Sequence, residues 1–368
     1  MATREALWRY RNEFGDAFGR TYFRRFGPGV VSSIGLGTYL GDPTDAVDDA
    51  LRETIDLALR SGVNVVDTAV NYRCGRSERV VGEAIRDADI DREAVVVATK
   101  GGFLPFDGHR PDDPAAYVRE RFVDTGLVDP DSLVGGSHCL EPDYVEWSLD
   151  RSLDRLGVET IDCYYLHNPE TQLAARSTEA VYDAIEACFE RLERRRLAGD
   201  VGRYGVATWD AFRTAPDGDR YLSLPAVLER AVAAGEAVGS DDDDHGFAAV
   251  QLPVNVVMAD AFTRANQRPS DASKPVSTLE FAHDAGLSVV TSASIAQGEL
   301  ATPGAIPAAV DGRLNGETPA QRAINFARSA PGVTCSLVGT TSVDHLRENV
   351  AAGTFDPLGA NAFDAVFE

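Results

Sequence analysis

Four polar residues of the sequence are placed where they could form one acid–base site. Asp67, Lys100 and His167 each end a short apolar run, and Tyr72 follows Asp67 within the same loop. When hydride reduces a carbonyl group, the oxygen becomes an alkoxide and needs a proton donor beside it. A tyrosine hydroxyl, with an ordinary pKa of about 10, suits this role if a neighbouring ammonium draws its pKa toward neutrality. These residue types therefore predict carbonyl reduction, or the reverse oxidation of an alcohol.

Lys100 supports this interpretation independently. It is one of two lysines, the other being Lys274, in a chain with 33 arginines, and it ends a run of apolar or small residues. A buried ammonium without a partner is costly, so a carboxylate such as Asp67 is expected beside it. Taken singly, each residue also has a structural interpretation: Asp67 as a cap, His167 as a hydrogen-bonded core histidine, and Tyr72 as a packing residue of its loop.

Eight repeated β–α units are expected to bring these residues together. Short apolar runs alternate with longer amphipathic segments, which is typical of parallel strands joined by helices. Eight units predict an α/β fold, a (β/α)8 TIM barrel, with an open doubly wound sheet as the alternative. Active sites of such barrels form on the face at the carboxyl ends of the strands. The expected strands are residues 33–36, 63–66, 94–99, 160–166, 201–207, 249–252, 287–291 and 334–338.

Several segments together resemble the aldo-keto reductase superfamily. Asp67-Thr-Ala-Val-Asn-Tyr72, Ala-Thr-Lys100 and Tyr-Tyr-Leu-His167 have the family's residue types in the family's order. The resemblance covers roughly residues 31–353. The acidic composition of the chain points to a haloarchaeal type of member of the family. Further segments that resemble the family are residues 34–38, 75–85, 201–206, 250–255, 318–321 and 346–349.

The resemblance implies roles for individual residues. Tyr72 would be the general acid in reduction, Lys100 would lower its pKa, Asp67 would keep Lys100 charged, and His167 would orient the carbonyl oxygen. A nicotinamide cofactor, NADP or NAD, is implied too, although the chain has no GxGxxG fingerprint of a Rossmann fold after an early strand. Residues expected at the cofactor are Gln251 at the carboxamide and Glu348 and Asn349 at the adenine.

Departures from the family pattern affect mainly the cofactor contacts. Thr208 stands where the family commonly has an Asn that contacts the carboxamide, and Ser292 stands where a Tyr commonly stacks on the nicotinamide. Trp209 or another aromatic residue is an alternative source of stacking. Arg347 is the nearest cation for the 2′-phosphate of NADP, so NADP is slightly favoured over NAD.

Two connections are longer than the usual two to six residues. Residues 101–142 and 208–246 are interpreted as long loop insertions on the carboxyl-terminal face of the barrel. The acidic run 241–244 within the second is expected to be a solvated loop tip and not a metal site. Six aromatic residues of the insertions either close over a pocket or pack the loops: Phe103, Phe106, Tyr117, Phe122, Trp209 and Phe212.

Composition excludes several classes of partner. A formal net charge of −23, spread along the chain, disfavours binding to nucleic acid and suits a halophilic protein whose surface charge is screened by concentrated salt. No segment has the length and apolarity of a membrane span or a signal peptide, so a cytoplasmic protein is expected. Five cysteines without a CxxC pair are interpreted as thiols, and His138-Cys139 alone does not make a zinc site. No metal is expected.

Residues 1–368 are interpreted as a single barrel domain with an N-terminal extension, residues 1–29. The predicted function is hydride transfer between the cofactor and a small carbonyl or sugar substrate. The alternative is a nucleotide-binding regulatory subunit that keeps the barrel but has little turnover. The identity of the substrate, the direction of the reaction and the oligomeric state stay open.

Overall fold

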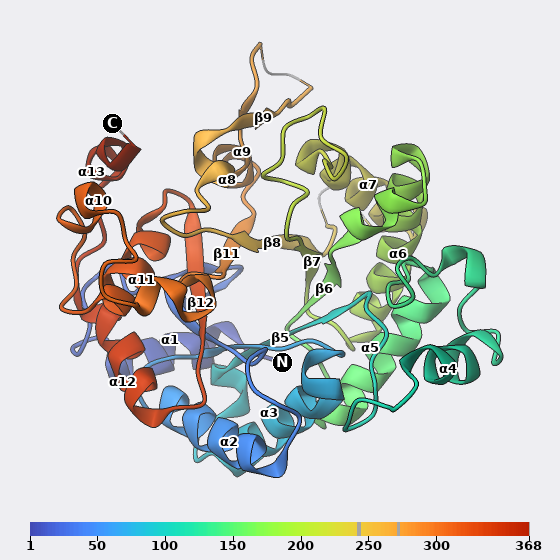
Figure 1. Ribbon diagram of the computed structural model, residues 1–368, viewed down its shortest axis with the longest axis horizontal. Coiled ribbons are helices and arrows are strands. Elements are labelled where there is room, and N and C mark those ends of the chain that lie inside the picture. Colours follow the sequence, from blue (N-terminus) through green and yellow to red (C-terminus); the bar gives the residue numbers. More distant parts are fainter. Residues whose placement is uncertain (241–243, 271–272, 368) are drawn as a thin grey trace.

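The computed structural model describes residues 1–240, 244–270 and 273–367. Its centre is a closed barrel of eight parallel strands, in which each strand pairs with its neighbours and the last unit closes onto the first (Figure 1). The barrel is therefore confirmed over the open sheet. In spatial order its strands are β3 (Ile34–Gly37), β4 (Val65–Asp67), β5 (Val96–Gly101), β6 (Cys163–His167), β7 (Tyr204–Ala207), β8 (Phe247–Pro253), β11 (Ser288–Ser292) and β12 (Val333–Gly339).

Helices surround the barrel and bury their apolar faces against the outer face of the strands (Figure 1). Several begin with a side-chain cap that satisfies free backbone N–H groups, such as the capping box of Thr318 and Gln321. No described helix combines the length and the apolarity needed to cross a membrane. The surrounding helices are α2 (Asp45–Leu59), α3 (Arg76–Asp87), α5 (Pro142–Leu156), α6 (Thr178–Ala198), α7 (Leu224–Ala237), α9 (Thr278–Asp284), α11 (Pro319–Ser329) and α12 (Val343–Ala351).

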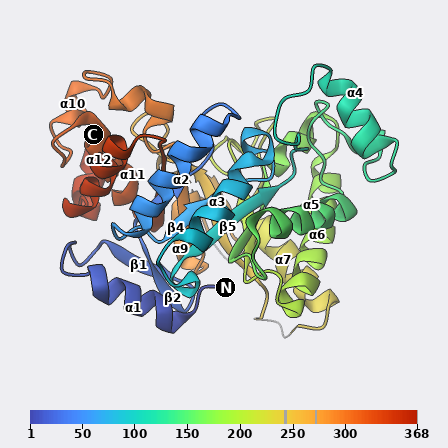
Figure 2. The same ribbon diagram turned by 90° about the horizontal axis from the view of Figure 1, so that it is seen from below.

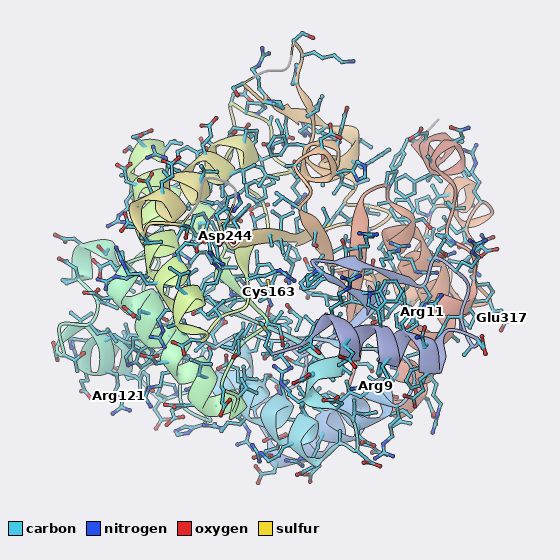
Figure 3. The ribbon with its side chains drawn as sticks, turned by 180° about the vertical axis from the view of Figure 1, so that it is seen from behind. Arg9, Arg11, Arg121, Cys163, Asp244 and Glu317 are labelled. Atoms are coloured by element: carbon cyan, nitrogen blue, oxygen red, sulfur yellow. The ribbon has the colours of Figure 1, made fainter. Side chains whose placement is uncertain are left out.

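The amino-terminal segment closes one end of the barrel. It forms α1 (Arg4–Phe14) and an antiparallel hairpin of β1 (Phe23–Phe26) and β2 (Gly29–Ser32). Three of its side chains, Leu7, Phe26 and Val31, pack against the residues that fill the barrel interior. In Figure 2, α1 and the hairpin lie at the opposite end of the molecule from α4 (Pro114–Val118) and α10 (Ala308–Asp311). In the reverse view of Figure 3, Arg9 and Arg11 mark α1, and Cys163 lies toward the centre of the barrel.

Alternation along the strands decides which side chains enter the barrel. Successive residues of a strand point to opposite faces, so every second residue points inward. Val96 and Ala98 fill the interior, which makes Lys100 the next inward residue of β5; Asp67 follows Val65 in the same way. The candidate residues on the strands thus form the uppermost inward layer, at the carboxyl ends.

One of the two long connections differs from its expected form. Residues 102–141 connect β5 to α5 and include α4 (Pro114–Val118) and the helical turns Arg119–Val123 and Pro130–Ser132. The prediction that residues 208–246 form one long loop is wrong, because α7 lies inside this range. The described residues of the range that precede and follow α7 are 208–223, 238–240 and 244–246. Most of the acidic run, residues 241–243, lies outside the described residues. Smaller peripheral elements are α8 (Asp260–Thr263), β9 (Ala265–Gln267), β10 (Val276–Ser277), α10 (Ala308–Asp311) and α13 (Ala360–Asp364).

Candidate active site

A cavity of about 420 Å³ opens at the carboxyl ends of the barrel strands. Asp67, Tyr72 and His167 line it, and Lys100 is fully buried behind Asp67 and Tyr72. The four residues predicted as catalytic therefore lie in one place. The complete lining of described residues is Gly37, Thr38, Tyr39, Leu40, Asp67, Asn71, Tyr72, Phe103, His167, Asn168, Ala207, Thr208, Trp209, Gln251, Ser292, Ala293, Ser294, Ile295, Gln297, Leu337, Val338 and Gly339.

The Lys100 ammonium is bonded to three oxygens. Its Nζ donates to Asp67 Oδ1 at 2.5 Å, to the Thr68 carbonyl at 2.9 Å and to the Tyr72 hydroxyl at 3.3 Å. Because an ammonium has three protons, this set uses all of its donors. The Tyr72 hydroxyl thus lies between the buried Lys100 ammonium and the cavity.

Burial and charge act against each other at this site. Burial favours the neutral form of Lys100, yet Asp67 and the Tyr72 hydroxyl hold its pKa above the ordinary value. Burial raises the pKa of Asp67, although Lys100 and Gln251 oppose that rise. The pKa of Tyr72 is also raised by burial, and Lys100 only limits the rise. The expected movement of the Tyr72 pKa toward neutrality is therefore not seen, because desolvation outweighs the ammonium.

His167 ends β6 and is held as a neutral imidazole. Burial, together with the positive charge of Lys100, keeps its pKa well below the ordinary value. Its ring lies edge-on to those of Tyr72 and Phe103, with centroids 5.9 Å and 5.0 Å away. A neutral imidazole beside a tyrosine hydroxyl can hydrogen-bond to a substrate oxygen without adding charge.

The backbone of His167 is fixed by two residues that the sequence analysis did not assign. His138 Nε2 lies 2.8 Å from the His167 carbonyl oxygen, and Gln172 Nε2 lies 2.8 Å from His138 Nδ1. Burial lowers the pKa of His138 to about 4, so its ring is neutral near pH 7. Both ring nitrogens of His138 are used in these contacts. The described residues contain no group of three or more metal-binding side chains.

Three of the six residues predicted at the cofactor line the cavity. Gln251 donates from Nε2 to Asp67 Oδ2 at 2.8 Å, and Ser292 ends β11 beside it. Thr208 lines the cavity as well, but its hydroxyl donates to Glu170 Oε1 at 2.7 Å and accepts from the Ala211 backbone N–H. A hydroxyl has one proton to give, so Thr208 has no free donor for a carboxamide.

The other three cofactor candidates lie on α12, outside the described cavity lining. Arg347 is exposed and pairs with Asp344 at 3.0 Å. The Glu348 carbonyl accepts from Gln321 Nε2, and Asn349 is buried. Contact between these residues and a cofactor requires a ligand that extends from the cavity across β12 to α12.

The rim next to β11 suits such an extended, anionic ligand. Ala293, Ala296, Gln297 and Gly298 all have positive φ, and the Ala296 and Gly298 N–H groups donate to the Ala293 and Ile295 carbonyls. The Ser294 hydroxyl is buried without a hydrogen-bond partner in the described part of the chain. An unpaired buried hydroxyl is unfavourable, so it is available to a ligand. This hydroxyl fits an anionic group of a nicotinamide dinucleotide, such as its diphosphate.

The aromatic residues of the insertions divide into two groups. Phe103 and Trp209 line the cavity, together with Tyr39, which the sequence analysis did not single out. Phe106, Tyr117 and Phe122 instead form a small apolar cluster within the insertion, and Phe212 is buried in the main core. No Lys or Arg side chain is among the described residues that line the cavity.

Comparison with known proteins places the whole barrel in one family. The family model described as "Aldo/keto reductase family" matches residues 33–368. Among curated proteins, the chain is 32% identical over 187 residues to the NADH-specific methylglyoxal reductase of Escherichia coli K12, a match that covers 50% of each chain. The chain thus spans about half the length of the curated relatives it matches.

Solved structures share the fold at low identity. An aldo/keto reductase from Klebsiella pneumoniae, in complex with NADP and acetate, has a TM-score of 0.59 and 21% identity, and the match covers 94% of both chains. The glycerol dehydrogenase of Gluconobacter oxydans has a TM-score of 0.62 and 18% identity, with 95% of both chains covered. Both are similar to this chain in fold.

Proposed function

Because this chain belongs to the aldo/keto reductase family, we propose that it transfers hydride between a nicotinamide cofactor and a small carbonyl or alcohol substrate. The observation that carries the proposal is the hydrogen-bonded series Asp67–Lys100–Tyr72, in which a buried ion pair ends at a hydroxyl on the cavity wall. A buried ion pair is expensive to maintain, and a shorter apolar residue would fill the same interior position. Its presence is explained by the chemistry of the hydroxyl.

In the proposed mechanism, each residue acts at one atom. A bound nicotinamide would supply the hydride in reduction and accept it in oxidation. Tyr72 would donate its proton to the substrate oxygen as negative charge develops there, and Lys100 would stabilise the resulting phenolate. Asp67 would keep Lys100 charged and in place. His167 would orient the substrate oxygen from its neutral ring.

The cofactor would lie from the cavity toward α12. Gln251 and Ser292 would contact the nicotinamide end, and Ser294 would contact the diphosphate. Glu348 and Asn349 would contact the adenine. Thr208 would support the wall through Glu170, with Trp209 beside it at the mouth of the cavity.

The proposal is tested by following nicotinamide absorbance at high KCl with a panel of aldehydes, ketones and sugars, in both directions. Turnover would support hydride transfer. Cofactor binding without turnover on any substrate would instead favour the regulatory-subunit alternative, which finds no support in relatives named as reductases and dehydrogenases.

The cavity lining leads to a prediction about substrate charge. Without a lining Lys or Arg, a carboxylate that enters the cavity loses water and gains no partner. We expect para-carboxybenzaldehyde to have a kcat/KM at least ~10²-fold below that of its methyl ester, since ~2.7 kcal/mol corresponds to that factor. The ester has a similar size, so it controls for shape. Equal kcat/KM values would contradict this prediction.

Cofactor choice is predicted to depend on Arg347. Its pair with Asp344 is exposed on both sides, with 64% and 90% of the side chains accessible, so the pair contributes little and Arg347 can turn to a phosphate. We propose that NADP is preferred, and expect Arg347→Ala to weaken NADP binding roughly ten-fold while NAD binding stays unchanged. Fluorescence titration measures both. Arg60→Ala, which removes another exposed Arg–Asp pair, is the matched control.

We further propose that the protein is cytoplasmic, and that it is halophilic, which its acidic composition supports. With a net charge of −23, the acidic side chains repel one another. Concentrated salt screens this repulsion, because the Debye length is only about 3 Å at 1 M. We expect the thermal midpoint of unfolding to fall on dialysis from molar KCl to low salt. Circular dichroism at a series of KCl concentrations measures it. A midpoint independent of KCl would contradict the halophilic assignment.

A further inference from the structure

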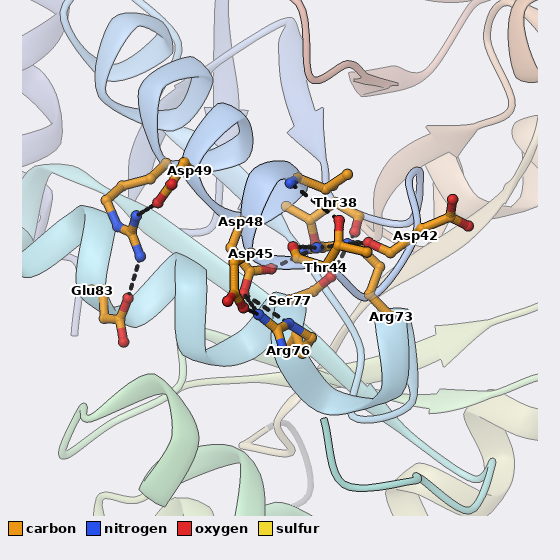
Figure 4. Close-up of polar contacts among 12 residues, drawn as sticks. Thr38, Asp42, Thr44, Asp45, Asp48, Asp49, Arg73, Arg76, Ser77 and Glu83 are labelled. Atoms are coloured by element: carbon orange, nitrogen blue, oxygen red, sulfur yellow. Dashed lines mark hydrogen bonds and ion pairs between the residues drawn. The ribbon is translucent and has the colours of Figure 1, made fainter. Parts of the chain in front are cut away.

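A cluster of polar contacts surrounds Arg73, the residue that follows Tyr72 in the chain (Figure 4). We name residues 68–75 the Tyr72 turn and residues 38–44, between β3 and α2, the Tyr39 loop. The Arg73 guanidinium reaches from the first to the second: Nε and Nη2 donate to the Asp42 carbonyl at 3.1 Å and 2.9 Å, and Nη2 donates to the Thr44 carbonyl at 3.3 Å. Nη2 also bonds Asp48 Oδ1 at 2.5 Å.

The backbone at this point is in an unfavourable conformation. Arg73 has φ 49° and ψ 43°, and Cys74 has φ 58° and ψ 37°, so two non-glycine residues in succession are left-handed. Each such residue costs roughly 1–2 kcal/mol. Gly75 follows with φ 78°, a conformation that glycine adopts without a steric penalty. The turn is therefore held in this form by contacts outside it.

Strained residues of this kind gather around the cavity. Among the described residues, the non-glycine residues with positive φ are Arg73, Cys74, Asn168, Ala293, Ala296 and Gln297. Every one lines the cavity or lies within two residues of a lining residue. Strain that persists at a functional site indicates that the surrounding structure fixes a geometry the site needs.

The guanidinium of Arg73 is itself costly to bury. Its side chain is 1% exposed, and Nη1 has no hydrogen-bond partner in the described part of the chain. A surface arginine would bind the same loop without that loss. Strain in the backbone and desolvation of the side chain thus occur in one residue, directly after Tyr72.

Both segments joined by Arg73 contribute to the cavity wall. Tyr39 packs edge-on against Tyr72, with ring centroids 5.1 Å apart, and Thr38 Oγ1 donates to the Asp67 carbonyl at 3.0 Å. On the other side of the Tyr72 turn, Arg155 donates a hydrogen bond to the Val70 carbonyl. Arg73 therefore joins the Tyr72 turn to the Tyr39 loop through hydrogen bonds, in addition to the packing of Tyr39 on Tyr72.

We propose that Arg73 is a positioning residue for the proposed reaction: it holds the Tyr72 hydroxyl at Lys100 and fixes Tyr39 against it. The expected kinetic effects rest on the proposed function. The expected structural effects concern only the order of the Tyr72 turn and the Tyr39 loop and do not need turnover. Arg73 does not touch the cavity, so it acts through Tyr72 and Tyr39 alone.

Three variants separate the parts of this argument. Arg73→Gly removes the guanidinium and relieves the left-handed strain at the same time. Arg73→Lys keeps a charge for Asp48 but lacks the planar fork that reaches two carbonyls and a carboxylate together. Arg76→Gln is the matched control, since Arg76 bonds the other oxygen of Asp48 but has ordinary helical geometry and no contact with the Asp42 or Thr44 carbonyls.

The kinetic readout is the split between kcat and KM, together with the pH dependence of kcat. We expect Arg73→Gly to lower kcat about ten- to hundred-fold, because small misplacements of a reacting group have effects of this size, while KM for the cofactor is little changed. The pH above which kcat of reduction falls should rise, because a Tyr72 hydroxyl farther from the Lys100 ammonium has a higher pKa. Arg73→Lys should restore part of kcat, and Arg76→Gln should retain the parent values.

A second readout does not need turnover. Amide hydrogen exchange is expected to rise in both the Tyr72 turn and the Tyr39 loop of Arg73→Gly, and in neither for Arg76→Gln. Parent-like exchange and parent-like kcat in Arg73→Gly would overturn the proposal, as would an equal loss of kcat in Arg76→Gln. If the parent lacks turnover, the proposed function fails, and the exchange result alone decides whether Arg73 holds the two segments.

Discussion

Tyr72→Phe is expected to lower kcat about 10²- to 10⁴-fold, the range over which general acid–base catalysis contributes. The substitution removes the hydroxyl that the Lys100 ammonium reaches at 3.3 Å and leaves the ring that packs against Tyr39 and His167. No other hydroxyl is bonded to Lys100 in the described part of the chain. The substrate oxygen would therefore lose its proton donor while the wall of the cavity keeps its shape.

The measurement compares kcat for an uncharged aldehyde with cofactor affinity in the same variant. Cofactor affinity should stay within about two-fold, and the free energy of unfolding should change by about 1 kcal/mol or less, because one net hydrogen bond is lost. Tyr117→Phe is a suitable control, since Tyr117 packs within the insertion cluster away from the cavity. Undiminished kcat in Tyr72→Phe would remove Tyr72 from the mechanism.

The barrel and the position of the four residues could be predicted because both follow from local pattern. Every second residue of a strand points into the barrel. Because Ala98 and Val65 point inward, the sequence predicts that Lys100 and Asp67, two residues later, point inward as well. Eight parallel strands then bring their carboxyl ends together whatever the loops contain. The side chains that meet there need only be at the ends of their strands.

Other parts of the site depend on contacts that no local pattern records. Arg73 bonds backbone carbonyls about thirty residues earlier in the chain, and any residue type offers such a carbonyl. Glu170 takes the Thr208 hydroxyl, which a family pattern assigns to the cofactor. The sequence predicts residues 1–29 only as an extension, because Leu7 and Phe26 do not form a periodic pattern that shows them packing against the barrel interior.

Lys100→Met is expected to have a double effect, on catalysis and on folding. Without the ammonium, burial raises the Tyr72 pKa further, so the hydroxyl becomes a weaker acid in reduction, and oxidation needs a higher pH to form the phenolate. We expect kcat to fall at least ~10²-fold at neutral pH. The free energy of unfolding should fall by about 3–5 kcal/mol, since Asp67 is left as a buried charge with Gln251 as its remaining partner.

A double variant separates the two effects. Adding Asp67→Asn to Lys100→Met removes the uncompensated charge, so the free energy of unfolding should recover toward the parent value, while kcat stays low because nothing replaces the ammonium at Tyr72. Thermal unfolding and kcat, measured on the parent, both single variants and the double variant, give the coupling between the two residues. Recovery of kcat along with stability would mean that the ion pair serves the fold alone. Stability regained without kcat would assign the pair to the chemistry of the Tyr72 hydroxyl, which explains why a barrel interior of apolar residues ends in a buried lysine.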